Sequence, residues 1–298
     1  MKLSTLVTTF DAPARRKRFR AGWPATSRAD IRFVETGGVL FRYRERGSGP
    51  VLLFCADPPV TLETYDELLD LYSQHFRVVI FEAPEMGFSV ASRSYGFSFA
   101  ETNAAIIAFM EAVTGPGAIT SFSCVAGLSS LAIAAERPDL ISKIILIQTP
   151  SWEEEVRWKY TRDPKRILSK PIIGQLAMRK LKHSRAPLWL GLAVGRRERI
   201  EPWCGCAQHT IEEGAGWDLA SAFQNYLTDT PDLPHKVRQP LLLLWGAKDG
   251  SHPTTRHDSA REHARGPVTA ITYDDLGHFP ELEDPPRVLN DMLAFAQS

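Results

Sequence analysis

The sequence has few of the features that would assign it directly to a common class of protein. It contains only four cysteines in 298 residues, and their spacing fits no disulfide framework. It has no apolar run near the roughly 18 residues that a membrane span needs, and residues 1–13 have no apolar core of a secretory signal. We therefore expect a cytoplasmic protein without a membrane span, whose thiols stay reduced.

An excess of charge of one sign is also missing. Lysine plus arginine and aspartate plus glutamate both number 35, so no positive field exists for a phosphate backbone and no nucleic-acid partner is expected. A glycine-rich phosphate loop is absent, and no nucleotide cofactor is expected either. The one basic stretch, residues 14–20, is predicted to be a solvated N-terminal arm; a localisation tag or a contact with an acidic surface is the alternative.

The sequence does contain enough apolar residues for a sizeable core. Hydrophobic residues make up 44% of the chain, and a chain of this length can form one α/β core with an insertion. Residues 31–34 and 39–43 alternate around a glycine turn, which predicts an antiparallel hairpin. The continuous apolar run 51–54 predicts a strand that is covered on both faces.

Strand and helix patterns then alternate, which predicts an α/β fold with a mostly parallel sheet and helices on both faces. Further strands are predicted at residues 77–81, 118–123, 143–147, 241–245 and 268–273. The alternation breaks where a helix-compatible stretch carries five tryptophans, and this stretch is predicted to be an inserted helical cap. The predicted parts are an N-terminal extension (1–30), the first part of the core (31–150), the cap (151–233) and the second part of the core (234–298).

The most informative segment, residues 119–127, joins an apolar strand to an amphipathic helix through small residues. Such a turn can hold a side chain in a strained, exposed position. A thiol there lies at a helix N-terminus, where the helix dipole favours an anion and lowers the pKa of the thiol. Cys124 occupies this position. Ser123 is the competing nucleophile, but Val125 would then stand where a small residue is required.

This segment resembles the nucleophile elbow of the α/β-hydrolase superfamily, in particular of the branch with a helical cap. The resemblance covers roughly residue 31 to the C-terminus, although Phe122 stands where the family usually has glycine. Two more landmarks resemble the family, a strand that ends at Asp249 and a closing segment, 275–285, that contains His278. The resemblance implies a triad in which Cys124 is the nucleophile, His278 the base and Asp249 the acid that orients the histidine.

The resemblance also implies an oxyanion hole made by the backbone N–H groups of Val125 and Asp57. The family usually has His-Gly in the second of these loops, where this chain has Cys55, Ala56 and Asp57. If Asp57 points inward, its charge opposes an oxyanion unless it is protonated or accepts a proton. Dienelactone hydrolases resemble this case in part, because they pair a cysteine nucleophile with a nearby carboxylate. Alternatively, Asp57 caps the helix that begins near Thr61 or faces solvent.

We therefore expect an enzyme that uses a Cys-His-Asp triad, without a cofactor, on an ester, thioester or lactone-like acyl substrate, with Asp57 and Ser123 as possible auxiliary residues. The tryptophans predict a bulky, apolar small molecule as substrate, or else they only attach the cap to the core. A non-hydrolytic acyl transferase, cyclase or C–C bond-cleaving enzyme is the alternative, as is a non-catalytic ligand-binding protein. Cys204, Cys206 and His209 match no standard zinc pattern, so no metal is expected. The oligomeric state stays open.

Overall fold

The computed structural model describes residues 28–92, 94–212, 219–228, 233 and 236–298. Their centre is a nine-stranded sheet in the order β1-β2-β4-β3-β6-β7-β8-β9, with β5 beside β2. The strands are β1 (Ile31–Thr36), β2 (Val39–Arg46), β3 (Val51–Ala56), β4 (Arg77–Glu82), β5 (Val90–Ala91), β6 (Ala118–Ser123), β7 (Ile141–Ile147), β8 (Leu241–Gly246) and β9 (Val268–Tyr273). The pairs that involve β2 are antiparallel, and all pairs from β4 to β9 are parallel.

Helices follow most of the strands. The α-helices are α2 (Asp66–Tyr72), α3 (Phe99–Val113), α4 (Ala126–Glu136), α5 (Trp152–Arg162), α6 (Ile173–Ala193), α7 (Ile200–Glu212), α8 (Leu219–Asn225), α9 (Pro280–Glu283) and α10 (Pro285–Gln297). The 3-10 helices are η2 (Leu62–Tyr65), η3 (Arg197–Arg199) and η4 (Ser259–His263). The predicted α/β architecture, a mostly parallel sheet with helices around it, is confirmed.

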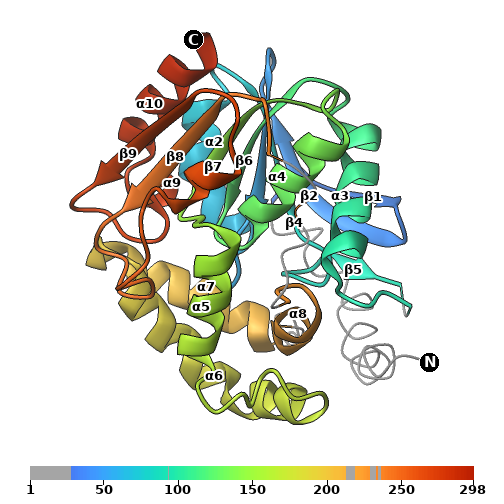
Figure 1. Cartoon of the computed structure of the whole chain (residues 1–298), viewed down its shortest axis with the longest axis vertical. Coiled ribbons are helices and arrows are strands. Elements are labelled where there is room, and N and C mark those ends of the chain that lie inside the picture. Colours follow the sequence, from blue (N-terminus) through green and yellow to red (C-terminus); the bar gives the residue numbers. More distant parts are fainter. Residues whose placement is uncertain (1–27, 93, 213–218, 229–232, 234–235) are drawn as a thin grey trace.

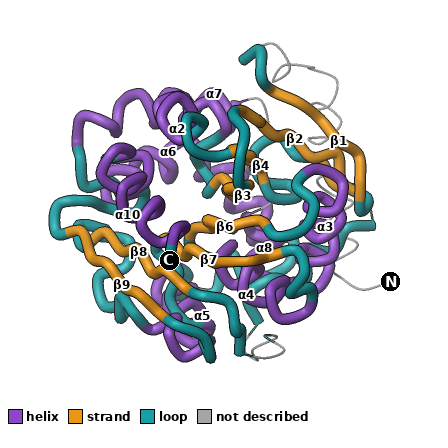
Figure 2. The backbone as a smooth tube through the Cα atoms, turned by 90° about the horizontal axis from the view of Figure 1, so that it is seen from above, coloured by secondary structure: helices purple, strands orange, loops and turns teal. Residues whose placement is uncertain are grey.

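The sheet is buried on both faces, as the apolar run in β3 predicts. Leu53 and Cys55 point into a hydrophobic cluster under α3 and α4, whereas Leu52 and Phe54 point into a second cluster under α2 and α10. The two pairs of helices lie on opposite sides of the strands (Figure 2). Because each residue of β3 meets apolar atoms on one side or the other, no polar residue interrupts the strand.

The helices between β7 and β8 lie together beyond one end of the sheet, in the lower part of Figure 1. They are α5, α6, η3, α7 and α8, and they fall within the stretch 151–233 that the sequence predicts to be a cap. Both α7 and α8 pack against α6. The division of the chain into core and cap remains a prediction.

No helix in the described part of the chain is long and apolar enough to cross a membrane. The basic stretch 14–20 lies outside the described residues, as does all of the predicted N-terminal extension before residue 28.

Candidate active site

The turn between β6 and α4 holds Cys124 in a left-handed backbone conformation, with φ of 51°. This conformation is strained for a residue other than glycine, and such strain is typical of functional sites. The backbone N–H of Cys124 donates to the carbonyl of Ile147 (2.8 Å), and the Thr149 hydroxyl donates to the Cys124 carbonyl (2.8 Å). A Cβ atom on Gly127 would lie 2.1 Å from that hydroxyl oxygen. The turn therefore needs glycine at 127.

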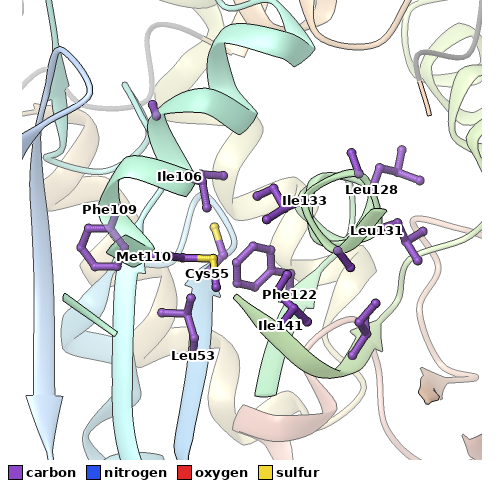
Figure 3. Close-up of a cluster of buried hydrophobic side chains, with 14 of the residues drawn as sticks. Leu53, Cys55, Ile106, Phe109, Met110, Phe122, Leu128, Leu131, Ile133 and Ile141 are labelled. Carbon is purple, nitrogen blue, oxygen red and sulfur yellow. The ribbon is translucent and has the colours of Figure 1, made fainter. Parts of the chain in front are cut away.

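The two residues before Cys124 belong to the strand. Ser123 is the last residue of β6 and is buried, and the left-handed conformation does not fall on it. Phe122, which stands where the resembled family has glycine, points into the cluster under α3 and α4, where its ring lies 5.5 Å from that of Phe81. Figure 3 shows Phe122 beside Cys55 in this cluster. The geometry therefore favours Cys124 over Ser123 as the residue at the tip of the turn, whereas Cys55 belongs to the hydrophobic cluster.

His278 and Asp249 lie side by side at the carboxyl ends of β9 and β8. Nδ1 of His278 is 2.6 Å from Oδ2 of Asp249, and both side chains are buried. Asp249 also accepts hydrogen bonds from the Gln148 amide (2.8 Å) and from the backbone N–H of Ser251 (2.7 Å). Burial alone would raise the pKa of Asp249, but the charge and hydrogen bond of His278 outweigh burial and hold this pKa below its ordinary value. The carboxylate is therefore fixed and ionised beside the imidazole.

Asp57, in the loop after β3, points inward. Its Oδ2 is 2.9 Å from Nε2 of His278, and the N-cap position of η2 is occupied by Thr61 instead. The imidazole thus lies between two carboxylates, one at each ring nitrogen. Burial alone would lower the pKa of His278, but the charge of Asp249 and hydrogen bonds to Asp249 and Asp57 raise it well above its ordinary value. His278 is therefore positively charged at neutral pH.

The sulfur of Cys124 lies close to this pair. Cys124 Sγ, a ring nitrogen of His278 and a carboxylate oxygen of Asp57 all lie within 4.8 Å of one another. The helix N-terminus was expected to lower the pKa of the thiol. Burial, with the charges of Glu155 and Asp57, instead raises it above its ordinary value, and the contact with His278 only partly offsets this. The thiol is therefore protonated at rest.

The two predicted oxyanion donors come from loops after neighbouring strands. Val125 is the first residue after Cys124 and has helical φ and ψ (−56° and −33°) at the N-terminus of α4. Asp57 directly follows β3, which pairs with β6. The use of their N–H groups as an oxyanion hole remains a prediction.

Three buried residues near the triad candidates were not predicted from the sequence. Oε1 of Glu155, on α5, is 3.8 Å from Cys124 Sγ. The His252 ring stacks on that of His278, with centroids 5.5 Å apart, and burial lowers the pKa of His252 to about 3. Burial raises the pKa of Glu281 to about 8. Glu155 is one of three consecutive glutamates in the first turn of a predicted helix, a pattern that ordinarily reflects the helix dipole and carries no functional signal.

Potential metal ligands in the described ranges gather only around His278. The two sets are Asp57, Cys124 and His278, and Asp249, His252 and His278. Hydrogen bonds of the imidazole with Asp57 and Asp249 account for most of this proximity, so we attribute both sets to the triad and its neighbours.

Cys204, Cys206 and His209 were considered from the sequence as metal ligands and set aside. The sulfur of Cys206 lies 3.0 Å from the Thr61 hydroxyl oxygen, and Cys204 is half-buried. The side chain of His209 lies outside the described residues. The expectation that no metal is bound stays a prediction.

The tryptophans of 151–233 were expected either to line a pocket for the substrate or to attach the cap to the core, and the structure places some beside the candidate site and others against the core. Trp189, on α6, meets the His278 ring edge-on at 5.1 Å, and Trp158 stacks on His252 at 5.2 Å. Trp152 is buried against the core, and Trp203 packs on Phe279. Two of the tryptophans therefore lie beside the candidate site, and two attach the helices to the core. The remaining tryptophan, at position 217, lies outside the described residues.

Comparison with solved structures gives relatives of the same fold at low sequence identity. A mutant of an epoxide hydrolase from Bacillus megaterium is 17% identical, with a TM-score of 0.69 over 90% of this chain and 100% of that one. Epoxide Hydrolase A from Mycobacterium thermoresistibile is 16% identical, with a TM-score of 0.70 over 90% and 98% of the two chains. A thermophilic esterase from Thermogutta terrifontis is 17% identical, with a TM-score of 0.67 over 89% and 98%.

A search of curated proteins gives no match. The family model described as "Alpha/beta hydrolase family" matches residues 47–292, which include the turn at Cys124 and both members of the Asp249–His278 pair. This match covers most of the chain. The chain therefore belongs to the alpha/beta hydrolase family.

Proposed function

We propose that this hydrolase-family enzyme uses Cys124 as a nucleophile on an ester, thioester or lactone-like acyl substrate, with His278 and Asp249 completing the triad. The observation that carries the proposal is the left-handed turn at Cys124, whose sulfur faces a histidine that is hydrogen-bonded to a buried aspartate at 2.6 Å. A nucleophile, a base and a group that orients the base are the parts that covalent acyl chemistry needs.

In the proposed reaction, Cys124 Sγ attacks the acyl carbon and the bond to the leaving group breaks. His278 already holds a proton between two carboxylates, so the thiol proton passes to the carboxylate side of the His278–Asp57 pair, whose members share a hydrogen bond of 2.9 Å. The products of this first step are a thioester on Cys124 and a free leaving group. Water then attacks the thioester, the proton held by the pair returns to the sulfur as the carbon–sulfur bond breaks, and the proton lost by water balances the one that the leaving group takes up.

The substrate that we propose is a bulky, apolar small molecule. Trp189 and Phe279 lie against the imidazole of His278, with ring centroids 5.1 and 5.0 Å from it, and aromatic side chains often line pockets for apolar ligands. We further propose that residues 151–233 act as a cap over this substrate. We also propose that the enzyme works in the cytoplasm, where its thiol stays reduced.

A second candidate function is a non-hydrolytic reaction on the same scaffold, such as acyl transfer, cyclisation or C–C bond cleavage. The observation that favours it is the carboxylate of Asp57 at Nε2 of His278, close to where an oxyanion would form. A negative charge there disfavours a tetrahedral oxyanion and favours proton abstraction.

The proposal is tested by acylating the protein with a p-nitrophenyl ester of an apolar acid and locating the adduct by mass spectrometry. We expect one acyl group on Cys124, none in a Cys124→Ala variant, and unchanged labelling in a Cys204→Ala control, because Cys204 lies on α7 and is not among the groups gathered around His278. Acyl groups on other cysteines but none on Cys124 would refute the triad. Adding an alcohol or amine acceptor separates the two candidates, since a transferase gives the acylated acceptor in place of the free acid.

A further inference from the structure

Glu155 is a buried acid that the proposed triad leaves without a role. It lies in the first turn of α5, where the Ser151 hydroxyl caps the helix and the backbone N–H of Glu155 donates to the Ser151 carbonyl (3.0 Å). Its side chain has no exposed surface. The helix therefore carries a carboxyl group from the segment 151–233 into the protein interior next to the nucleophile.

The two oxygens of Glu155 have different surroundings. Oε1 is 3.8 Å from Cys124 Sγ, whereas Oε2 has no hydrogen-bond partner within the described residues. Leaving a buried polar atom without a partner costs about 1–3 kcal/mol, so native proteins rarely do it without a reason. An unpartnered carboxyl oxygen beside the attacking sulfur indicates that a substrate atom is its missing partner.

The charges around Glu155 keep it in the acid form at neutral pH. Burial is the largest effect and, with the negative charges of Asp57 and Asp249, raises its pKa to about 8, while the positive charge of His278 and the contact with the Cys124 thiol lower it. These four residues come from the loops after β3, β6, β8 and β9. Tyr226, just after α8, is a further buried titratable group near Glu155, and the charge of Glu155 contributes to the raised pKa of Tyr226. A neutral carboxylic acid has one O–H group to donate.

We propose that Glu155, in its protonated form, is the general acid that delivers a proton to the leaving group when the acyl group is transferred to Cys124. This role rests on the proposed triad and adds to it a catalytic residue from α5. A second proton donor is useful here, because Nε2 of His278, which would ordinarily supply the leaving group, is already hydrogen-bonded to Asp57.

The protons balance in both halves of the reaction. In the first half, the Sγ–C bond forms, the bond from carbon to the leaving group breaks, the thiol proton goes to the His278–Asp57 pair and the Glu155 proton goes to the leaving group. In the second half, water adds to the thioester, its proton returns to the Glu155 carboxylate, and the His278–Asp57 pair reprotonates the sulfur. Both side chains are then restored, and no other reactant is needed.

The test compares two leaving groups on the same bulky, apolar acid. A p-nitrophenolate leaves without being protonated, whereas the alkoxide from a methyl ester needs a proton. Formation of the acyl–Cys124 adduct is followed by intact-protein mass spectrometry in the wild type and in three variants. These are Glu155→Gln, which keeps the shape of the side chain, Glu155→Asp, which keeps the acid, and Glu153→Gln, an exposed control on the same helix.

For Glu155→Gln we expect acylation by the methyl ester to fall by about 10²-fold, the lower end of the usual contribution of a general acid, with little change for the p-nitrophenyl ester. Glu155→Asp should recover part of the loss, and Glu153→Gln should behave as the wild type. In the wild type, the ratio of methyl to p-nitrophenyl rates should fall as the pH rises past about 8, because Glu155 then loses its proton. This pH dependence should vanish in Glu155→Gln.

Other results overturn the proposal. An equal loss with both esters means that Glu155 only supports the structure, which melting temperatures check independently. An equal gain with both esters means that Glu155 acts only through its negative charge, since that charge raises the pKa of the Cys124 thiol. No change with either ester also refutes it. If the wild type itself forms no Cys124 adduct with either ester, the triad proposal fails and this role fails with it.

Discussion

Replacing Asp57 with asparagine should make the Cys124 thiol more reactive. The carboxylate lies within 4.8 Å of the sulfur, and its side chain is only 13% exposed. At an effective dielectric constant of about 20, a unit charge at that distance disfavours a thiolate by about 3 kcal/mol, which is roughly a 10²-fold effect on the thiolate population. Asparagine has nearly the same shape but no charge, so it removes this repulsion.

A second effect opposes the first. The hydrogen bond from His278 to Asp57 helps to raise the pKa of the imidazole, so the Asp57→Asn variant holds less positive charge beside the sulfur. Because Asp249 still contacts the other ring nitrogen at 2.6 Å, most of that positive charge should remain. We therefore expect a net gain of between about 10-fold and 10²-fold in the thiolate population.

The assay is the rate at which iodoacetamide alkylates Cys124 at pH 7, read by peptide mass spectrometry. Iodoacetamide is uncharged, so the removed charge does not alter its approach. Asp70→Asn is the matched control, because Asp70 is exposed and paired with Arg46 away from the site. An unchanged or slower alkylation of Cys124 in Asp57→Asn would show that Asp57 does not suppress the thiolate, and the account of the resting site would be wrong.

Three further predictions address other parts of the site. Asp249→Asn removes the charge beside Nδ1 of His278, the proposed base, and acylation of Cys124 should slow by about 10²-fold or more in single-turnover assays. A smaller loss would argue against the proposed triad. Gly127→Ala places a Cβ atom 2.1 Å from the Thr149 hydroxyl oxygen, and it should lower the free energy of unfolding, measured by urea titration, by about 1–3 kcal/mol. Gly191→Ala is the control, because its Cβ atom meets nothing within 4 Å, and it should cause no such loss. His252 is buried, and its pKa is lowered to about 3 in the folded protein. Between about pH 6.5 and pH 3 its side chain is therefore protonated in the unfolded chain but neutral in the folded one. The free energy of unfolding should fall on acidification through this range by up to about 1.4 kcal/mol per pH unit. In His252→Phe the free energy of unfolding should depend less on pH over this range. An unchanged pH dependence would show that groups other than His252 cause the loss of stability in acid.

Much of the fold could be predicted from local patterns, because a strand that is buried on both faces needs a continuous run of apolar residues. The apolar run predicted at 51–54 became β3, whose alternate residues enter two separate cores. The short strand β5 and the 3-10 geometry of η4 were not predicted. Two paired residues and a single 3-10 turn leave too short a pattern to separate from loop.

The resemblance located the turn at Cys124 and the pair of Asp249 and His278, because these stand at the ends of predicted strands. It did not fix the ionisation state of the thiol. A helix N-terminus alone lowers the pKa of a thiol, and this was the expectation. Burial next to Glu155 and Asp57 has the opposite and larger effect, and it depends on segments far apart in the sequence.

The sequence by itself determined where the longer strands form, where the chain turns sharply after β6, and which residues stand at the ends of those strands, since each of these depends on residues close together in the chain. Only the tertiary structure decided that Asp57 turns inward to Nε2 of His278 and that α5 brings Glu155 to within 3.8 Å of the sulfur of Cys124. Those contacts join residues 221 and 31 positions apart, and no local pattern encodes them. Asp57 and Glu155 strongly affect the protonation of Cys124 and His278, because the charge of one buried group shifts the pKa of its neighbours more than it would in water.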